Sequence, residues 1–217
     1  MNVLVIDTSS ARSLAAVVRL RGETVEAVHE RSADDGKAHG ELLAGLVAGA
    51  LAAAGTSVDD LDAVVVGAGP GPFTGLRVGI VTAAVTASLR GIPLYGVGSL
   101  DALAAGVDAR PLVVATDARR REVYWARFEA DGTGTGPQVG PPAEVPVAGA
   151  AVTGAGATQY AEVFGASLGA DHPTAAGLVH CALDRLLHGA PSENVEPLYL
   201  RRPDAVVPTG RKSTVQS

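Results

Sequence analysis

The segment Gly69–Gly79 is the part of this chain with the most distinctive spacing of glycine and proline. It follows a short apolar run and opens into a helical pattern, where many α/β proteins bind a phosphate or a partner. It has no Lys-Ser/Thr pair like that of a P-loop, and it lacks the third glycine of a dinucleotide fingerprint. Pro70 and Pro72 also remove two backbone donors from any anion cradle. The loop therefore leaves phosphate binding and partner binding both open.

The residues that could hold a metal or act as nucleophiles are few. None of the five histidines lies four residues from another, and His180 and His188 are two helical turns apart, too far to share an ion. Ser99 lacks the Gly-x-Ser-x-Gly elbow of serine hydrolases. Cys181 lies in an apolar helical stretch, as is typical of a buried structural thiol. We therefore expect neither a metal site nor a catalytic residue.

The first half of the chain predicts three strands, a helix, a strand, a helix, a strand and a short helix, an order typical of α/β proteins. A continuous apolar run ends at Asp7, as expected of a strand buried on both faces. Gly55 is the expected C-terminal cap of the first helix, and Thr74 and Ser99 are expected N-caps of the later ones. The expected bounds are 3–6, 14–20, 24–30, 39–54, 63–66, a helix from about residue 74, 93–97 and 100–105.

The pattern of the second half begins the same order again. An apolar run over 112–116 ends at Asp117, as the first strand ends at Asp7, and 122–129 predicts its partner strand. The Gly- and Pro-rich stretch 133–146 predicts an exposed loop, and helices are expected over 158–168 and 174–187. We divide the chain into a lobe over 1–106, a smaller lobe over 107–200 and a disordered tail over 201–217, leaving open which lobe the last helix joins.

Composition indicates a compact globular protein, with 47% apolar and 18% charged residues. The net charge of −6 divides unevenly, because 1–200 hold 13 basic and 22 acidic side chains while 201–217 hold four and one. An acidic body is a poor main platform for RNA, which is bound through Lys and Arg. A single cysteine, no leader pattern and no membrane span together favour the cytoplasm.

Four stretches resemble one protein family. Gly69–Gly79 is similar to the Gly-Pro-Gly-Ser-Phe-Thr-Gly-Leu-Arg-Ile-Gly signature of the bacterial TsaB (YeaZ) proteins, with Pro72 where serine is usual. The opening Val3–Ser9, the helix start His39–Leu43 and the closing Glu196–Arg201 agree with the same family. The resemblance spans the chain and is densest in its first half.

The resemblance implies an actin- or Hsp70-like (ASKHA) fold of two lobes, the second reduced. It implies a non-catalytic subunit that supports a TsaD-type transferase in N6-threonylcarbamoylation of adenosine 37 in tRNA. The implied partners are that transferase, a TsaE-type ATPase and a second copy of the chain, with tRNA bound only indirectly and no membrane. No cofactor of its own is expected, although ATP or ADP could bind at the complex interface. The nucleotide-binding positions of actin-like proteins map, as a vestigial set, to Asp7, Thr8, Gly69, Gly71, Thr74 and Gly75.

The two helices of the first half are apolar around most of their circumference. Small residues recur every fourth position in the second one, which favours close helix packing. Such helices either lie inside the fold or meet another protein, and in TsaB-like proteins the corresponding helices bundle with those of TsaD or of a second copy. The predicted partner interface is Leu42, Leu46, Leu76, Arg77, Ile80, Val81 and Ala84.

Two alternatives stay open. The chain could be an independent ATPase or sugar-type kinase that uses Asp7 and the 67–75 loop. The cluster Arg119–Arg121 could contact phosphates of RNA or nucleotide, or it could be a solvated turn.

Overall fold

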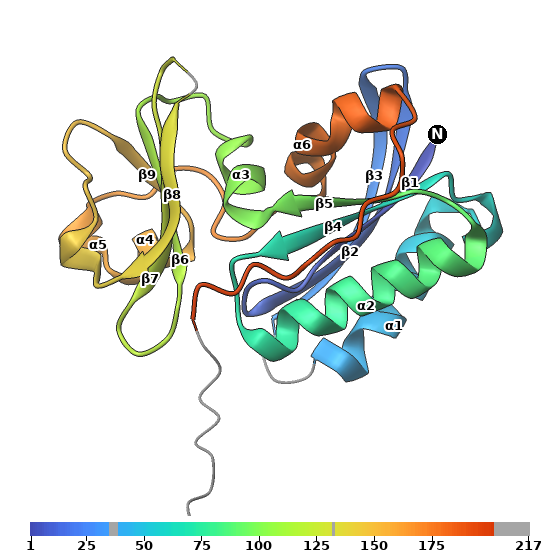
Figure 1. Ribbon diagram of the computed structural model, residues 1–217, viewed down its shortest axis with the longest axis horizontal. Helices are drawn as coiled ribbons and strands as arrows, with labels where there is room; N and C mark the ends of the chain where they lie inside the picture. Colours follow the sequence, from blue (N-terminus) through green and yellow to red (C-terminus); the bar gives the residue numbers. More distant parts are fainter. Residues whose placement is uncertain (35–38, 132, 202–217) are drawn as a thin grey trace, which may run out of the picture.

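The computed structural model describes residues 1–34, 39–131 and 133–201. The predicted disordered tail lies outside these residues from position 202 onward. The described chain forms two β-sheets that stand side by side, with helices packed on each (Figure 1). The predicted α/β class is confirmed.

The first sheet has the strand order β3-β2-β1-β4-β5. β1 pairs antiparallel with β2 and parallel with β4, and β5 runs parallel to β4. Val3–Ile6 is fully buried, which explains why β1 has no polar alternation. The strands are β1 (Asn2–Asp7), β2 (Arg12–Arg21), β3 (Thr24–Asp34), β4 (Ala63–Gly69) and β5 (Leu94–Gly98).

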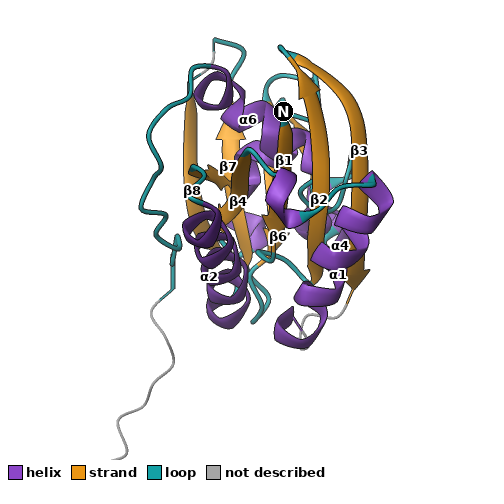
Figure 2. Cartoon of the chain, turned by 90° about the vertical axis from the view of Figure 1, so that its right-hand side faces the viewer, coloured by secondary structure: helices purple, strands orange, loops and turns teal. Residues whose placement is uncertain are grey.

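Helices cover both faces of this sheet (Figure 2). α1 (His39–Ala54) and α2 (Phe73–Arg90) lie on one face, where Leu4 and Ile6 join their buried side chains in one core. α3 (Ser99–Ala104) and α6 (Ala175–Leu187) pack on the other, against Val3 and Val5. α1 has the predicted bounds, and Gly91 caps the C-terminus of α2 with a left-handed φ of 63°.

The second sheet has the order β8-β7-β6-β9 and repeats the first sheet without its last strand. β6 pairs antiparallel with β7 and parallel with β9, as β1 does with β2 and β4. The predicted echo of the first strands is therefore present. The elements are β6 (Leu112–Asp117), β7 (Val123–Phe128), β8 (Gly134–Gly140), β9 (Ala151–Thr153), α4 (Ala155–Gln159) and α5 (Ala161–Phe164). Short 3-10 turns lie between β8 and β9, at Pro142–Glu144, and between α1 and β4, at Val58–Asp60.

Several local predictions were wrong. The stretch 133–146 is not a loop throughout, because β8 pairs with β7 despite its glycines and Pro137. The helix expected over 158–168 is replaced by the short α4 and α5. α2 begins at Phe73 with Pro72 as its N-cap, so Thr74 lies inside the first turn. Gly98, and not Ser99, caps α3, because the Ser99 hydroxyl is bonded elsewhere.

The last helix packs on the first sheet, which answers the question that the sequence leaves open. The helix was expected over 174–187, and Thr174 is its N-cap, with its side chain accepting a hydrogen bond from the Gly177 amide at 3.1 Å. The chain therefore returns to the first sheet after completing the second. The division into lobes over 1–106 and 107–200 stays a prediction.

After α6 the chain runs as an extended segment along the first sheet, beside α2, to the second sheet (Figure 1). The Glu193 and Leu198 amides donate to the carbonyls of Leu94 and Ala68 at 2.9 and 2.8 Å. Arg201 then ion-pairs with Glu122 and donates to the Ala118 carbonyl, both beside the turn between β6 and β7. We call residues 190–201 the C-terminal segment.

No helix within the described residues has the length and hydropathy needed to cross a bilayer.

The thiol of Cys181, on α6, should react slowly with alkylating reagents. Burial, helped by the charge of Asp101, raises its pKa from 9.0 to about 11. At pH 8 this lowers the thiolate fraction, and with it the reaction rate, roughly 100-fold relative to an unshifted thiol. Labelling with iodoacetamide, followed by mass spectrometry in native buffer and in denaturant, measures the ratio. Equal rates would contradict the packing described for α6.

Candidate functional site

The carboxylate of Asp7, at the end of β1, is enclosed by the chain itself. The side chain is 1% exposed, and Oδ1 accepts hydrogen bonds from the amide and hydroxyl of Ser9 at 3.0 and 2.8 Å. Oδ2 accepts from the Ser99 hydroxyl at 2.9 Å, and that hydroxyl in turn accepts from the Gly69 amide. Burial raises the pKa of Asp7, while these hydrogen bonds act in the opposite direction. The group ties β1, β4 and α3 together.

Thr8 joins the end of β1 to the start of α2. It is 1% exposed, and its hydroxyl donates to the Gly75 carbonyl at 2.7 Å. A Cβ at Gly79 would overlap this hydroxyl, so the helix can lie this close to β1 only with glycine there. Of the small residues of α2, Gly75, Gly79, Ala83 and Ala87 are all buried. This row therefore packs on the chain's own sheet.

The loop between β4 and α2 approaches the β1–β2 turn backbone to backbone. Gly69 has a φ of +103°, and a Cβ at Gly71 would overlap the backbone of Ser9. The glycines of the signature thus serve close packing within the fold. The predicted nucleotide-binding role of this set stays a prediction, and Thr74 is its exposed member.

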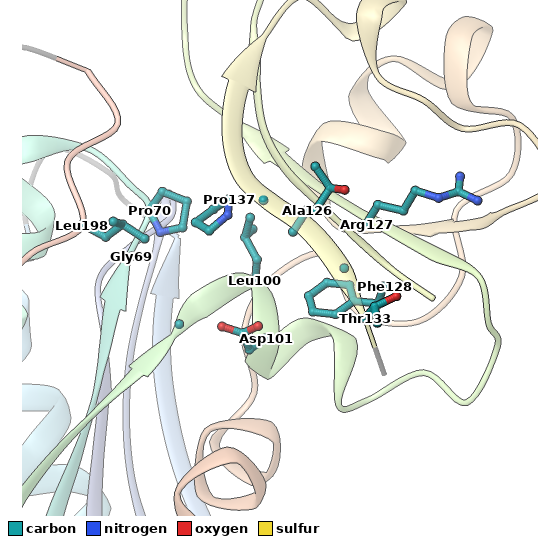
Figure 3. Close-up of a pocket in the computed structure, with 14 residues that line it drawn as sticks. Gly69, Pro70, Leu100, Asp101, Ala126, Arg127, Phe128, Thr133, Pro137 and Leu198 are labelled. Atoms are coloured by element: carbon teal, nitrogen blue, oxygen red, sulfur yellow. The ribbon is translucent and has the colours of Figure 1, made fainter. Parts of the chain in front are cut away.

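A cleft of about 280 Å³ opens at the ends of β4 and β5, against β7 and β8. Figure 3 shows Pro70 and Leu198 on the side of the first sheet, with Ala126, Phe128 and Pro137 across from them. Asp101 reaches its rim, and burial raises the pKa of this carboxyl. Among the described lining residues, Gly69 is the one member of the predicted nucleotide set.

A further cavity lies between the β1–β2 turn and the second sheet, and its lining includes Ser10, Asp117 and His172. It measures about 40 Å³, well below the roughly 300–1,000 Å³ of small-molecule sites. Asp117 lines this cavity, whereas the buried Asp7 does not. Within the described residues no group of three or more His, Cys, Asp or Glu side chains is placed to hold a metal ion.

One face of α2 is apolar and exposed. Positions four apart on a helix share a face, and Val81, Val85 and Leu89 are 59%, 52% and 80% exposed. Phe73 and Arg77 extend the same row toward the start of the helix and are also exposed. We call these five residues the α2 face. It is a row of the kind that marks a protein interface.

The structure buries two residues of the predicted interface, and the interface itself stays a prediction. Leu76 and Ile80 are 0% and 6% exposed and belong to the core beneath α2, so they are not surface residues. Arg77 and Val81 are exposed on the α2 face, while Leu42, Leu46 and Ala84 are half-buried. Phe73, Val85 and Leu89, which the sequence analysis did not name, are exposed in the same row, and their spacing from Val81 is a signal that the sequence carries.

The cluster Arg119–Arg121 forms the turn between β6 and β7. All three residues have a left-handed backbone, with φ of 62°, 54° and 62°, a conformation that costs non-glycine residues free energy. The Arg119 amide donates to Asp117 Oδ1 at 2.8 Å, which helps to hold the turn. The structure therefore places the cluster in a turn, and contact with RNA stays untested.

Comparisons with known proteins give the family. The family model described as TsaD, tRNA N6-adenosine threonylcarbamoyltransferase, matches residues 29–164, more than half of the chain. A solved structure from Pseudomonas aeruginosa, described as YeaZ, is 27% identical with a TM-score of 0.74, covering 92% of this chain and 99% of that one.

Among curated proteins, an uncharacterized protein of Mycobacterium tuberculosis is 48% identical, covering 94% of this chain and 93% of the relative. A Mycobacterium leprae relative has the same identity, but this chain spans only 55% of its length. The Escherichia coli tRNA threonylcarbamoyladenosine biosynthesis protein TsaB is 36% identical over 62% of this chain and 58% of its own length. The two-sheet fold and these likenesses confirm the actin-like class, and the chain belongs to the TsaB (YeaZ) family.

Proposed function

We propose that this chain supports N6-threonylcarbamoylation of adenosine 37 in tRNA as a non-catalytic subunit that activates a TsaD-type transferase. The observation that carries the proposal is the exposed apolar face of α2 in a member of the TsaB (YeaZ) family. The transferase docks on this face and moves the threonylcarbamoyl group from its adenylate to N6 of the base. The chain acts by stabilising a competent arrangement of its partner, which is a coupling of two equilibria through an interface.

The packing of α2 supports a docking role. Its inner row is fixed by close contact with β1 and β4, so the outer row is presented without a large ordering cost. Docking removes Val81, Val85 and Leu89 from water, and an interface of about 1,600 Å² in total is of ordinary size for such a complex.

The polar geometry at the end of β1 supports a role without chemistry of its own. Both oxygens of the Asp7 carboxylate accept hydrogen bonds from Ser9 and Ser99, and the side chain is sealed from solvent. It lacks the exposed oxygen that a magnesium ion or a phosphate-bound water requires.

Further partners follow from the same proposal. A TsaE-type ATPase joins the complex, ATP or ADP binds at the shared interface, and two copies of the chain pair through α1 and α2 when the transferase is absent. tRNA is held mainly by the transferase, in keeping with the net charge of −6. The complex works in the cytoplasm.

Reconstitution tests the proposal. We expect the cognate TsaD-type transferase to modify tRNA at least about 10-fold faster with this protein present, a difference of about 1.4 kcal/mol in activation free energy. The assay counts modified nucleosides after digestion of the tRNA, with threonine, bicarbonate, ATP and the adenylate-forming enzyme supplied. Equal rates with and without the protein would refute the role. ATP hydrolysis by the isolated chain would instead support the ATPase alternative.

A further inference from the structure

Arg77 is the single cation within the α2 face, and it stands beside an aromatic pair. Its guanidinium carbon lies 4.1 Å from the centre of the Phe73 ring, and Nε donates to the Tyr199 hydroxyl at 3.0 Å. Phe73 and Tyr199 stack with their ring centres 4.7 Å apart. The C-terminal segment thus contributes a residue to the surface that α2 exposes.

Several contacts hold Tyr199 where it meets Arg77. The Leu198 amide donates to the Ala68 carbonyl at 2.8 Å, next to the Gly-Pro loop. Two residues later, Arg201 pairs with Glu122 and the Ala118 carbonyl beside the second sheet. Tyr199 is therefore fixed on both sides, and its ring and hydroxyl limit the positions that the Arg77 guanidinium can take.

The charge of Arg77 has no counter-ion among the described residues, where its hydrogen-bond partner is the neutral Tyr199. Another arginine of the same helix shows the contrast. Arg90 pairs with Asp59, with Nη1 and Oδ1 2.7 Å apart, and also donates to the Asp59 carbonyl. A partner that covers the α2 face takes Arg77 out of water, which is costly unless an opposite charge meets it.

We infer that the partner presents an apolar helix carrying one carboxylate, and that this carboxylate pairs with Arg77 on docking. A planar guanidinium held in one orientation suits a two-point contact with a carboxylate. Val81, Val85 and Leu89 supply the apolar contact, and the Arg77 pair sets its register along the helix. The inference rests on the proposed function, since it specifies the transferase surface that docks there.

Binding of the cognate TsaD-type transferase to variants of the full chain tests this inference, with affinities measured by calorimetry. We expect Arg77→Met to weaken binding about 10- to 100-fold and Arg77→Glu to weaken it at least about 10-fold more, through repulsion. Tyr199→Phe keeps the ring stack and removes the hydroxyl, and a loss of about 3-fold is expected. Arg90→Met is the matched control and should change affinity less than about 2-fold.

The salt dependence gives a second readout. Wild-type affinity should fall between about 50 and about 500 mM NaCl, and Arg77→Met should remove most of that fall. In the Arg77→Glu background, reversing one acidic residue of the transferase helix to Arg should restore binding. The inference would be overturned if Arg77→Met and Arg90→Met bound the transferase with equal affinity. It would also be overturned if no charge reversal on the transferase helix restored the binding of Arg77→Glu. If the wild-type chain fails to bind at all, the proposed function falls instead.

Discussion

Val81→Glu should lower the affinity of this chain for a TsaD-type transferase at least about 100-fold, or about 2.7 kcal/mol. Val81 lies at the centre of the α2 face with 59% of its surface exposed. A carboxylate at that position would be taken out of water by the docked partner and would compete for Arg77 with the carboxylate that the partner presents, whereas in the free chain it would point into water. The variant should therefore weaken binding without unfolding the chain, because the free energy of unfolding should change by less than about 0.5 kcal/mol.

Co-purification and calorimetry measure the affinity, and the same variant should lose the stimulation of tRNA modification. The matched control is Leu168→Glu, which places the same charge at an exposed apolar residue near the second sheet. If Val81→Glu bound the transferase as tightly as Leu168→Glu does, the α2 face would not be part of the interface. A lowered melting temperature for Val81→Glu would show that the residue supports the fold and does not report on docking.

Gly67→Ala should destabilise the fold by about 3 kcal/mol, a loss of about 6–12 °C in melting temperature. Gly67 lies in β4, and an added Cβ would overlap Asp7 Oδ2 and lie 2.9 Å from the Ser99 hydroxyl. Asp7 is short and bonded on both oxygens, so it cannot swing aside without leaving buried donors unsatisfied. The steric strain from the added Cβ and the loss of the Asp7 hydrogen bonds would both lower the free energy of unfolding.

Thermal and urea unfolding measure this loss. Gly45→Ala is the matched control, because Gly45 lies inside α1 with no atom near an added Cβ. That variant should gain about 0.5–1 kcal/mol from higher helix propensity. If Gly67→Ala unfolds at the wild-type temperature, the packing described for the end of β1 is incorrect.

The elements that local chemistry specifies could be predicted from the sequence. The unbroken apolar run before Asp7 indicated a strand buried on both faces, and Gly55 marked the end of α1. β8 was missed because its glycines and Pro137 are unfavourable in a strand. The strand is stabilised by its antiparallel pairing with β7, which the local sequence of β8 does not reveal. β9 is three residues long, too short for its pattern to stand out.

The sequence was enough to propose which helix forms the candidate interface, but not which face of that helix is exposed. α2 is apolar around most of its circumference, so periodicity does not tell which row meets the sheet. Leu76, Ile80 and Val81 were all assigned to the partner, yet of these only Val81 is exposed, in a row with Val85 and Leu89. The contacts that hold one row against the sheet are non-local, as in the Thr8 hydroxyl that donates to the Gly75 carbonyl 67 positions away.

The packing of α6 on the first sheet has a consequence for biosynthesis. Val3, Val5 and Leu14 on that side stay uncovered until Leu178, Val179 and Leu186 have left the ribosome. The earliest strands to be made are thus among the last to be enclosed, and a nascent chain halted at position 106 should need a chaperone to remain in solution. Ultracentrifugation of such a fragment measures this, and a soluble monomer would show that the first sheet can fold before its final helix is translated.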